Sequence, residues 1–129
     1  MTEGIEAITT AALGLALDAA TLRQQAIAAN IANANTAGYH PVSVNFESQL
    51  EDARMALQNE GRMDAASLAG VTPRLEVDLA PQALGLSPKV MVDVEVAHMA
   101  QNAVQYQALI RGLSKHFAIM SAAVSDGKK

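Results

Sequence analysis

The side chains that could carry chemistry in this sequence are few and widely spaced. Glu95 and His98 have the Glu-x-x-His spacing found in di-iron helical bundles, where a complete site needs two such motifs and two further carboxylates. Here the motif occurs once, and the N-terminal segment adds only Glu3, Glu6 and Asp18. The sequence therefore predicts no metal site and no cofactor.

The other residue types used in catalysis are equally isolated. His40 and His116 have no motif around them, and lone histidines are more typical of polar surfaces or interfaces than of general bases. Ser125 and Lys128 have Ser-x-x-Lys spacing but lack the companion motifs of such enzymes. The chain contains no cysteine, and Gly38 is not part of a phosphate-binding loop. The interpretation is that this protein is not an enzyme.

A cluster of amide and hydroxyl side chains marks the end of an alanine-rich segment. Asn30, Asn33, Asn35, Thr36 and Gly38 lie within nine positions. Asn and Thr compete for backbone hydrogen bonds and Gly accepts positive φ, so a helix should end here. Asn30 and Asn33 also share one helix face. Two interpretations stay open, an ordinary helix stop or a polar lock against a partner helix.

The segment before this cluster, residues 2–33, has the apolar periodicity of a long helix. A 3,4 spacing typical of a coiled-coil seam reaches the polar position Asn33 through Ile5, Ile8, Ala12, Leu15, Ala19, Leu22, Ala26 and Ala29. A second apolar stripe beside the first consists of Leu13, Leu17, Ala20, Ile27 and Ile31. Two stripes on one helix predict more than one packing partner.

Residues 93–124 carry the most regular pattern in the chain and predict a second long helix, with Asp93 as its N-cap. The 3,4 alternation runs through Val96, Met99, Ala103, Tyr106, Ile110, Leu113, Phe117, Met120 and Val124. Because both ends of the chain carry such a seam, we expect the two end helices to pair as an antiparallel coiled coil.

The middle of the chain predicts shorter elements. His40–Val44 should be extended because Pro41 restricts its neighbour, and Asn45 can cap a short helix that ends by Gly61. Residues 62–91 hold three prolines and are expected to be mostly loop. A brief strand is indicated by the alternation of Leu75, Glu76, Val77, Asp78 and Leu79.

The predicted fold class is mainly α: two long end helices, a short helix, and a loop-rich middle with at most a brief strand. The expected segments are an N-terminal helix (1–36), a turn and short helix (37–61), a variable linker (62–91), and a C-terminal helix and tail (92–129). A chain of 129 residues forms one domain at most. Half of the residues are hydrophobic but only four are Phe or Tyr, which suits close helix packing.

Charge and targeting features exclude two broad classes. The net charge is −4 and the nine basic residues form no patch, which argues against nucleic-acid binding. Arg23 is the first basic residue, so a secretory signal peptide is not expected. Asp18 interrupts the apolar run that begins at Ala11, and we do not expect an integral membrane protein. A specialised export apparatus would escape these rules.

Residues 29–39, Ala-Asn-Ile-Ala-Asn-Ala-Asn-Thr-Ala-Gly-Tyr, resemble the N-terminal signature of bacterial flagellar rod and hook proteins, whose pattern is close to A-N-x-A-N-x-x-T-P-G-Y. The residues that carry the signature turn are Asn30, Asn33, Asn35, Thr36, Gly38 and Tyr39. Ala37 stands where Pro is usual, and Pro would preset the second position of a turn whose third residue is Gly. Ala can adopt that conformation at an entropic cost.

The C-terminal segment supports the same resemblance. Val92–Glu95 and Asn102–Leu109 resemble the closing helix of proximal rod proteins, and Phe46–Leu50 fits the segment after the turn. The likeness covers roughly residues 12–60 and 90–124. Longer rod and hook proteins insert β-domains between the end helices, for which this chain has no room.

The resemblance implies a structural subunit of the flagellar basal-body rod, exported by the flagellar type III machine without a cleaved signal peptide and located in the shaft that crosses the periplasm. Its implied partners are itself, other rod subunits, the FliE adaptor and the export gate. The expected assembly seam consists of Leu15, Leu22, Ala26, Tyr106, Ile110, Leu113, Phe117 and Met120. Two alternatives stay open: a rod subunit at a neighbouring position, and a self-contained helical bundle that binds a metal or small ligand.

Overall fold

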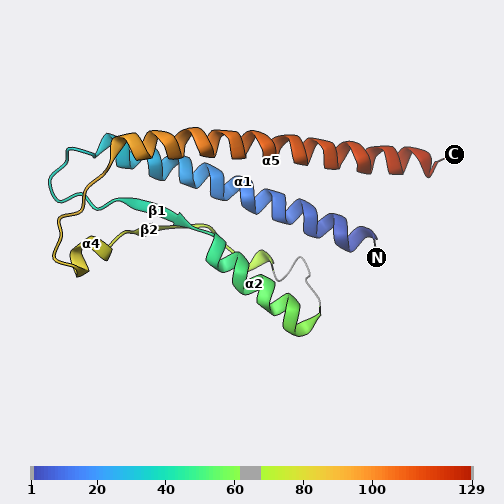
Figure 1. The fold of residues 1–129 in the computed structure, drawn as a ribbon. Helices are drawn as coiled ribbons and strands as arrows, with labels where there is room; N and C mark the ends of the chain where they lie inside the picture. Colours follow the sequence, from blue (N-terminus) through green and yellow to red (C-terminus); the bar gives the residue numbers. More distant parts are fainter. Residues whose placement is uncertain (1, 62–67, 129) are drawn as a thin grey trace.

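Two long antiparallel helices dominate the structure, a computed structural model that describes residues 2–61 and 68–128 (Figure 1). They are α1 (Thr2–Ala32) and α5 (Val92–Asp126). The C-terminal end of α1 lies beside the N-terminal end of α5, and the two helices diverge toward the chain termini. The predicted mainly helical fold with long end helices is therefore confirmed.

The Asn-rich segment ends α1 as the sequence predicts. The helix finishes at Ala32, and the backbone N–H of Tyr39 then donates to the carbonyl oxygen of Thr36 at 3.2 Å. Gly38 has φ +75°, the value required at the third position of a type II turn. Ala37 occupies the second position of that turn with φ below zero.

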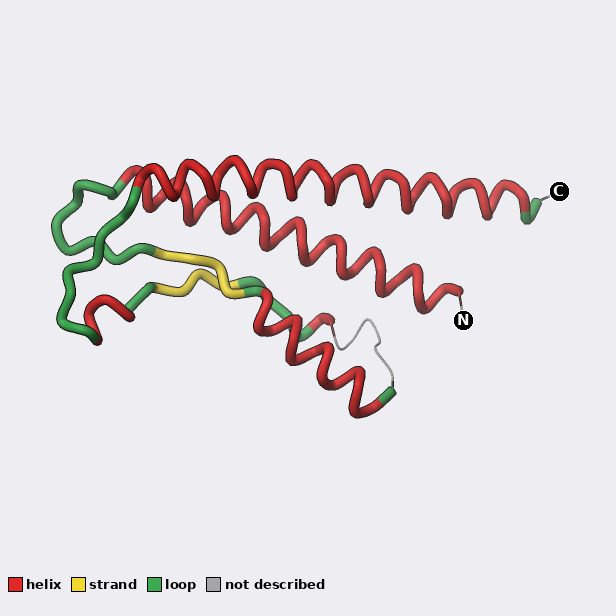
Figure 2. The backbone as a smooth tube through the Cα atoms, in the orientation of Figure 1, coloured by secondary structure: helices red, strands yellow, loops and turns green. Residues whose placement is uncertain are grey.

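A two-stranded antiparallel sheet follows the turn, formed by β1 (Val42–Asn45) and β2 (Arg74–Val77), which pair Val42 with Val77 and Asn45 with Arg74 (Figure 2). The prediction of at most one brief strand was wrong in number. The extended segment around Val42 was expected, but its partner lies in the predicted linker, and local alternation cannot reveal such a distant pairing.

The middle of the chain also contains α2 (Glu47–Glu60) and the short α4 (Ala80–Ala83). In the first turn of α2, the Leu50 N–H donates to the Phe46 carbonyl oxygen at 3.0 Å. The short helix after Asn45 was expected, whereas α4 was not. Together β1, α2 and β2 form an arm that lies along one side of α1 (Figure 1).

The main apolar cluster lies between α1 and this arm. Its buried members are Ala19, Ala26, Val44, Phe46 and Val71, and four partly buried residues pack against them: Leu15, Leu22, Val42 and Ala53. The predicted α1 seam therefore supplies the surface on which the arm packs. Small alanine side chains let the strand and Phe46 approach the helix closely.

The contact between α1 and α5 contains polar side chains that the predicted coiled coil lacks. The Asn102 amide Nδ2 donates to the Ala20 carbonyl oxygen at 2.9 Å and to Gln24 Oε1 at 3.2 Å. The α5 side chains that are at least partly buried are Glu95, Met99, Asn102, Leu109, Leu113, His116 and Met120. Because the rotation that brings Glu95 and Asn102 onto α1 turns Val96 and Ala103 outward, the predicted coiled-coil pairing is not confirmed.

Candidate functional site

Asn30 joins four parts of the fold through one side chain, 3% exposed. Its amide Nδ2 donates to the Val42 carbonyl oxygen at 2.8 Å and to Glu95 Oε2 at 3.2 Å. Its Oδ1 accepts from the Val42 N–H at 2.9 Å and from the Tyr39 hydroxyl at 2.8 Å. A primary amide has two donor hydrogens and two acceptor lone pairs, so this side chain is fully satisfied. We call Asn30, Tyr39, Val42 and Glu95 the Asn30 junction.

The chemistry of the junction explains why asparagine is required at position 30. The side-chain amide pairs with both the N–H and the C=O of Val42, as a neighbouring strand would. Aspartate could accept the Val42 N–H but could not donate to the carbonyl oxygen, and alanine would leave both groups without this partner. The first asparagine of the signature thus docks β1 onto the end of α1 and ties both to α5.

Tyr39 contributes a proton donor to the junction. Burial, reinforced by the negative charge of Glu95, raises the pKa of the Tyr39 phenol above its usual value near 10. The hydroxyl therefore stays protonated through neutral pH and can donate to Asn30 Oδ1. This bond holds the residue after the Gly38 turn against α1.

The remaining signature residues act within their own segment. Asn33 Nδ2 donates to the Ala29 carbonyl oxygen at 2.9 Å, and Asn33 Oδ1 accepts from the Thr36 hydroxyl at 3.3 Å. Asn35 is exposed. Of the two asparagines on one face, Asn30 is the one that contacts the partner helix, and Asn33 closes the end of its own helix.

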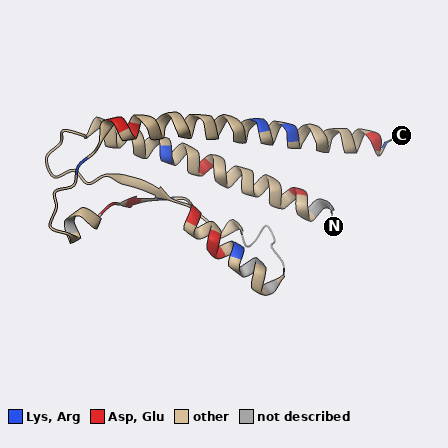
Figure 3. Ribbon diagram, viewed as in Figure 1, with Lys and Arg blue, Asp and Glu red and all other residues tan. Residues whose placement is uncertain are grey.

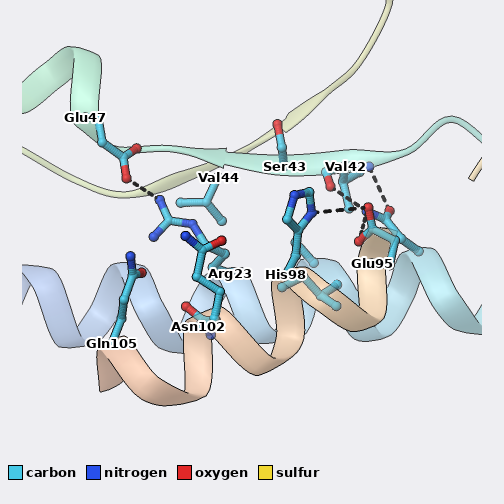
Figure 4. A pocket seen from close by; sticks show the side chains of 13 residues that line it. Arg23, Val42, Ser43, Val44, Glu47, Glu95, His98, Asn102 and Gln105 are labelled. Carbon is cyan, nitrogen blue, oxygen red and sulfur yellow. Dashed lines mark hydrogen bonds and ion pairs between the residues drawn. The ribbon is translucent and has the colours of Figure 1, made fainter. Parts of the chain in front are cut away.

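A polar pocket of about 320 Å³ lies beside the junction, between α1, β1 and α5 (Figure 4). At one side Arg23 Nη2 forms an ion pair with Glu47 Oε1 at 2.6 Å and links α1 to α2. At the other, His98 Nδ1 lies 3.9 Å from Glu95 Oε1. Across residues 2–61 and 68–128, no group of three or more His, Asp or Glu side chains is placed to hold a metal.

Of the two residues in the Glu-x-x-His spacing, only Glu95 has a clear structural role. Glu95 accepts a hydrogen bond from Asn30 and anchors the first turn of α5, while His98 is largely exposed beside it. The sequence identifies Asn30 because it lies in a short segment rich in Asn and Thr. It did not find Arg23, Glu47 or Asn102, because each has its partner on another element and no local pattern marks it.

The outward face of α5 carries a continuous apolar stripe. Its residues recur every seven positions, and we call Val96, Ala103, Ile110, Phe117 and Val124 the outer stripe. Its largest side chain, Phe117, is 49% exposed. Charged residues are sparse along both long helices (Figure 3). Contiguous exposed apolar surface is typical of interaction sites in general.

Helix α1 also has an apolar surface that extends beyond its contacts within the chain. By length and composition alone Gly4–Ala32 could cross a membrane, a property shared by buried core helices of soluble proteins and by N-terminal signal sequences. Only 11% of its most apolar 18-residue stretch is buried within the structure. Much of the apolar surface of α1 is therefore not covered by the rest of the described chain.

The structure divides the predicted assembly seam into two groups. On α1, Leu15, Leu22 and Ala26 belong to the cluster under the arm. On α5, Leu113 and Met120 are partly buried, whereas three residues are exposed: Tyr106, Ile110 and Phe117. The exposed group is the part of the predicted seam that the rest of the described chain does not cover.

Comparisons with known proteins agree with these features. The pattern of the family described as flagella basal body rod protein matches residues 12–40, which include α1 from Ala12 onward and the signature turn. The flagellar basal body rod protein FlgB of Escherichia coli (strain K12) is 29% identical over 123 residues, 87% of this chain and 89% of the relative. FlgB of Bacillus subtilis (strain 168) is 28% identical over 126 residues, 88% and 90% of the two chains. The chain is thus similar to flagellar basal body rod proteins, through the family pattern in residues 12–40 and through FlgB relatives over most of its length.

Proposed function

We propose that this protein is a structural subunit of the proximal flagellar rod that assembles by packing its end helices against neighbouring subunits. The observation that carries the proposal is the outer stripe of α5, an apolar surface without a partner among the described residues. The similarity to FlgB proteins over nearly the whole chain supports the same conclusion.

The proposed mechanism is burial of apolar surface between subunits. Phe117 and Ile110 are 49% and 39% exposed, so burying the rest of either side chain would contribute roughly half of the 1.5–3 kcal/mol that burial of a fully exposed side chain gives. The heptad spacing of the outer stripe suits coiled-coil packing against an end helix of a neighbour. Such contacts repeat head to tail and build a tube when they do not close into a ring.

The proposed partners and route of the subunit are those that the resemblance to rod proteins implies. We infer that it contacts other rod subunits above, and the FliE adaptor and export gate below. We also infer that it leaves the cell through the flagellar type III machine without a cleaved signal peptide, and that its site of action is the rod segment in the periplasm. Support comes from the signature turn and from the similarity to FlgB.

The test is a single charge in the outer stripe. In a strain of the source bacterium that lacks its own copy of the gene, we expect Phe117→Asp to fail to restore swimming, because a carboxylate would be buried at the subunit contact. Ala118→Asp is the matched control, since Ala118 is exposed on the same turn but lies about 100° around the helix.

Both variants should be produced at the wild-type level, with equal helix content by circular dichroism. Purified basal bodies should contain rods with Ala118→Asp and lack them with Phe117→Asp. Normal swimming with Phe117→Asp would show that the outer stripe is not an assembly surface.

A further inference from the structure

The strand β2 has a free edge with apolar side chains. It pairs with β1 on one side, and all four residues from Arg74 to Val77 are exposed. Leu75 and Val77 are 49% and 51% exposed, although both share a sheet face with the better-buried Val44. Edge strands of this kind are templates for pairing with another chain.

The backbone groups on this edge can be assigned from the register. Val42 turns its N–H and C=O toward Asn30, so Val42 and Val77 form a non-hydrogen-bonded pair. The bond from the Asp78 N–H to the Pro41 carbonyl oxygen, 2.9 Å, agrees with this alternation. Leu75 and Val77 therefore point their N–H and C=O groups away from β1, and within residues 2–61 and 68–128 these groups have no hydrogen-bond partner.

Two antiparallel registers of β2 against a second copy bring opposite charges together, and the one centred on Leu75 does so without facing like charges. With Leu75 opposite the Leu75 of a second copy, each Arg74 faces a Glu76 across the new pair, and the outward groups of both Leu75 residues bond to each other. Shifting the centre to Glu76 places each Arg74 opposite an Asp78, but it also places the two glutamates opposite each other at the centre of the pair. Shifting it to Val77 places Glu76 opposite Asp78, and like charges in facing positions are destabilising.

We propose that two copies of this protein pair through β2, antiparallel and centred on Leu75, to form a four-stranded sheet. Leu75 and Val77 of both copies then share one apolar face, and the charged residues share the other. The two β1 strands, and with them the two α1 helices, would lie three strand spacings apart, about 14 Å. Packed helices need only 8–10 Å, so both copies of α1 fit on the same face of the sheet.

This contact differs in symmetry from the contact of the rod. A two-fold pairing uses the same patch on both copies and closes after two subunits, whereas rod contacts repeat head to tail. The pairing therefore belongs to the subunit outside the rod and does not depend on the proposed function. Since the strand is four residues long, we expect weak, concentration-dependent association.

The test uses the full chain, which contains no cysteine, so that a single introduced thiol reports the contact. In the proposed register the two Leu75 Cα atoms lie about 5.5 Å apart, within the range that a disulfide can bridge. We expect mild oxidation to convert Leu75→Cys to a covalent dimer. Glu76→Cys would lie about 8 Å from its counterpart and should crosslink poorly.

Leu84→Cys, 75% exposed and outside β2, controls for random collision. Adding Arg74→Glu to Leu75→Cys should lower the initial rate of crosslinking about fivefold, because two facing opposite-charge pairs become like-charge pairs. Adding Glu76→Arg as well should restore the rate. The proposal is overturned if Leu75→Cys stays monomeric, crosslinks no faster than Leu84→Cys, or is insensitive to the Arg74 charge.

A backbone variant gives a second, independent readout. Leu75→Pro removes only an outward N–H, which β1 does not use, so the intramolecular sheet should persist by circular dichroism. Sedimentation of the otherwise wild-type protein should show concentration-dependent dimers that are absent in Leu75→Pro. Equal dimerisation of both proteins would also overturn the β2 contact.

Discussion

At the scale of single residues, two side-chain amides connect the long helices to distant elements by hydrogen bonds to their backbone. Asn30 pairs with Val42 and Glu95, and Asn102 pairs with Ala20 and Gln24. The two differ in one respect. Asn30 has all of its hydrogen-bonding groups satisfied, whereas the Asn102 Oδ1 is buried without a partner. A fully bonded amide stabilises a fold, and a partly bonded one costs free energy.

The prediction at this scale concerns Asn30. Replacing it by aspartate keeps the size but removes both N–H donors and places a second carboxylate beside Glu95. We expect Asn30→Asp to lower the free energy of unfolding by about 2–4 kcal/mol at pH 7, measured by urea denaturation. Asn35→Asp, at an exposed position of the same signature, should change it by less than about 0.5 kcal/mol. Equal effects would refute the central role of Asn30.

At the scale of elements, the sequence predicts what depends on local spacing. The lengths of α1 and α5 and the turn at Gly38 follow from apolar periodicity and from the Asn-rich segment. The pairing of β1 with β2 does not, because it joins segments far apart in the chain. Periodicity also leaves the rotation of α5 undetermined, since a seam through Glu95 and Asn102 has the same repeat as one through Val96 and Ala103.

The prediction at this scale concerns the polar contact of α5. Because Asn102 is buried with an unpartnered oxygen, Asn102→Leu should leave the free energy of unfolding unchanged or raise it by up to about 1–2 kcal/mol. We expect the variant to lose the single, well-defined register between α1 and α5, since a buried amide that bonds one carbonyl oxygen fixes the axial position of a helix. We expect additional amide resonances in NMR spectra of Asn102→Leu. The control is Asn30→Leu, which leaves the N–H and C=O of Val42 without their partner and should destabilise the fold. If Asn102→Leu destabilised the fold as strongly as Asn30→Leu, the two asparagines would not differ as proposed.

At the scale of the whole molecule, packing is concentrated at one end. Among the described residues of the two long helices, those that are fully buried are Ala19, Ala20, Ala26, Ile27, Asn30 and Asn102. They lie toward the end of the molecule that holds the Asn30 junction, while the helix ends near both chain termini diverge from each other (Figure 1). The subunit therefore has a closed end, held by its own contacts, and an open end, whose apolar surface is available to neighbours.

This asymmetry predicts a gradient of local stability along both helices. In the isolated protein, amides at Ala19–Asn30 and Glu95–Leu109 should exchange with deuterium on the order of 100-fold more slowly than those at Gly4–Thr10 and Ser121–Asp126. The reason is that opening the free ends disrupts little buried surface, whereas opening the closed end breaks the bonds of Asn30 and Asn102. In rods that contain the protein, contact with neighbours should protect the free ends as well. Uniform protection of the isolated helices would mean that the open end is stable without neighbours, and assembly would then be docking of preformed helices rather than their ordering.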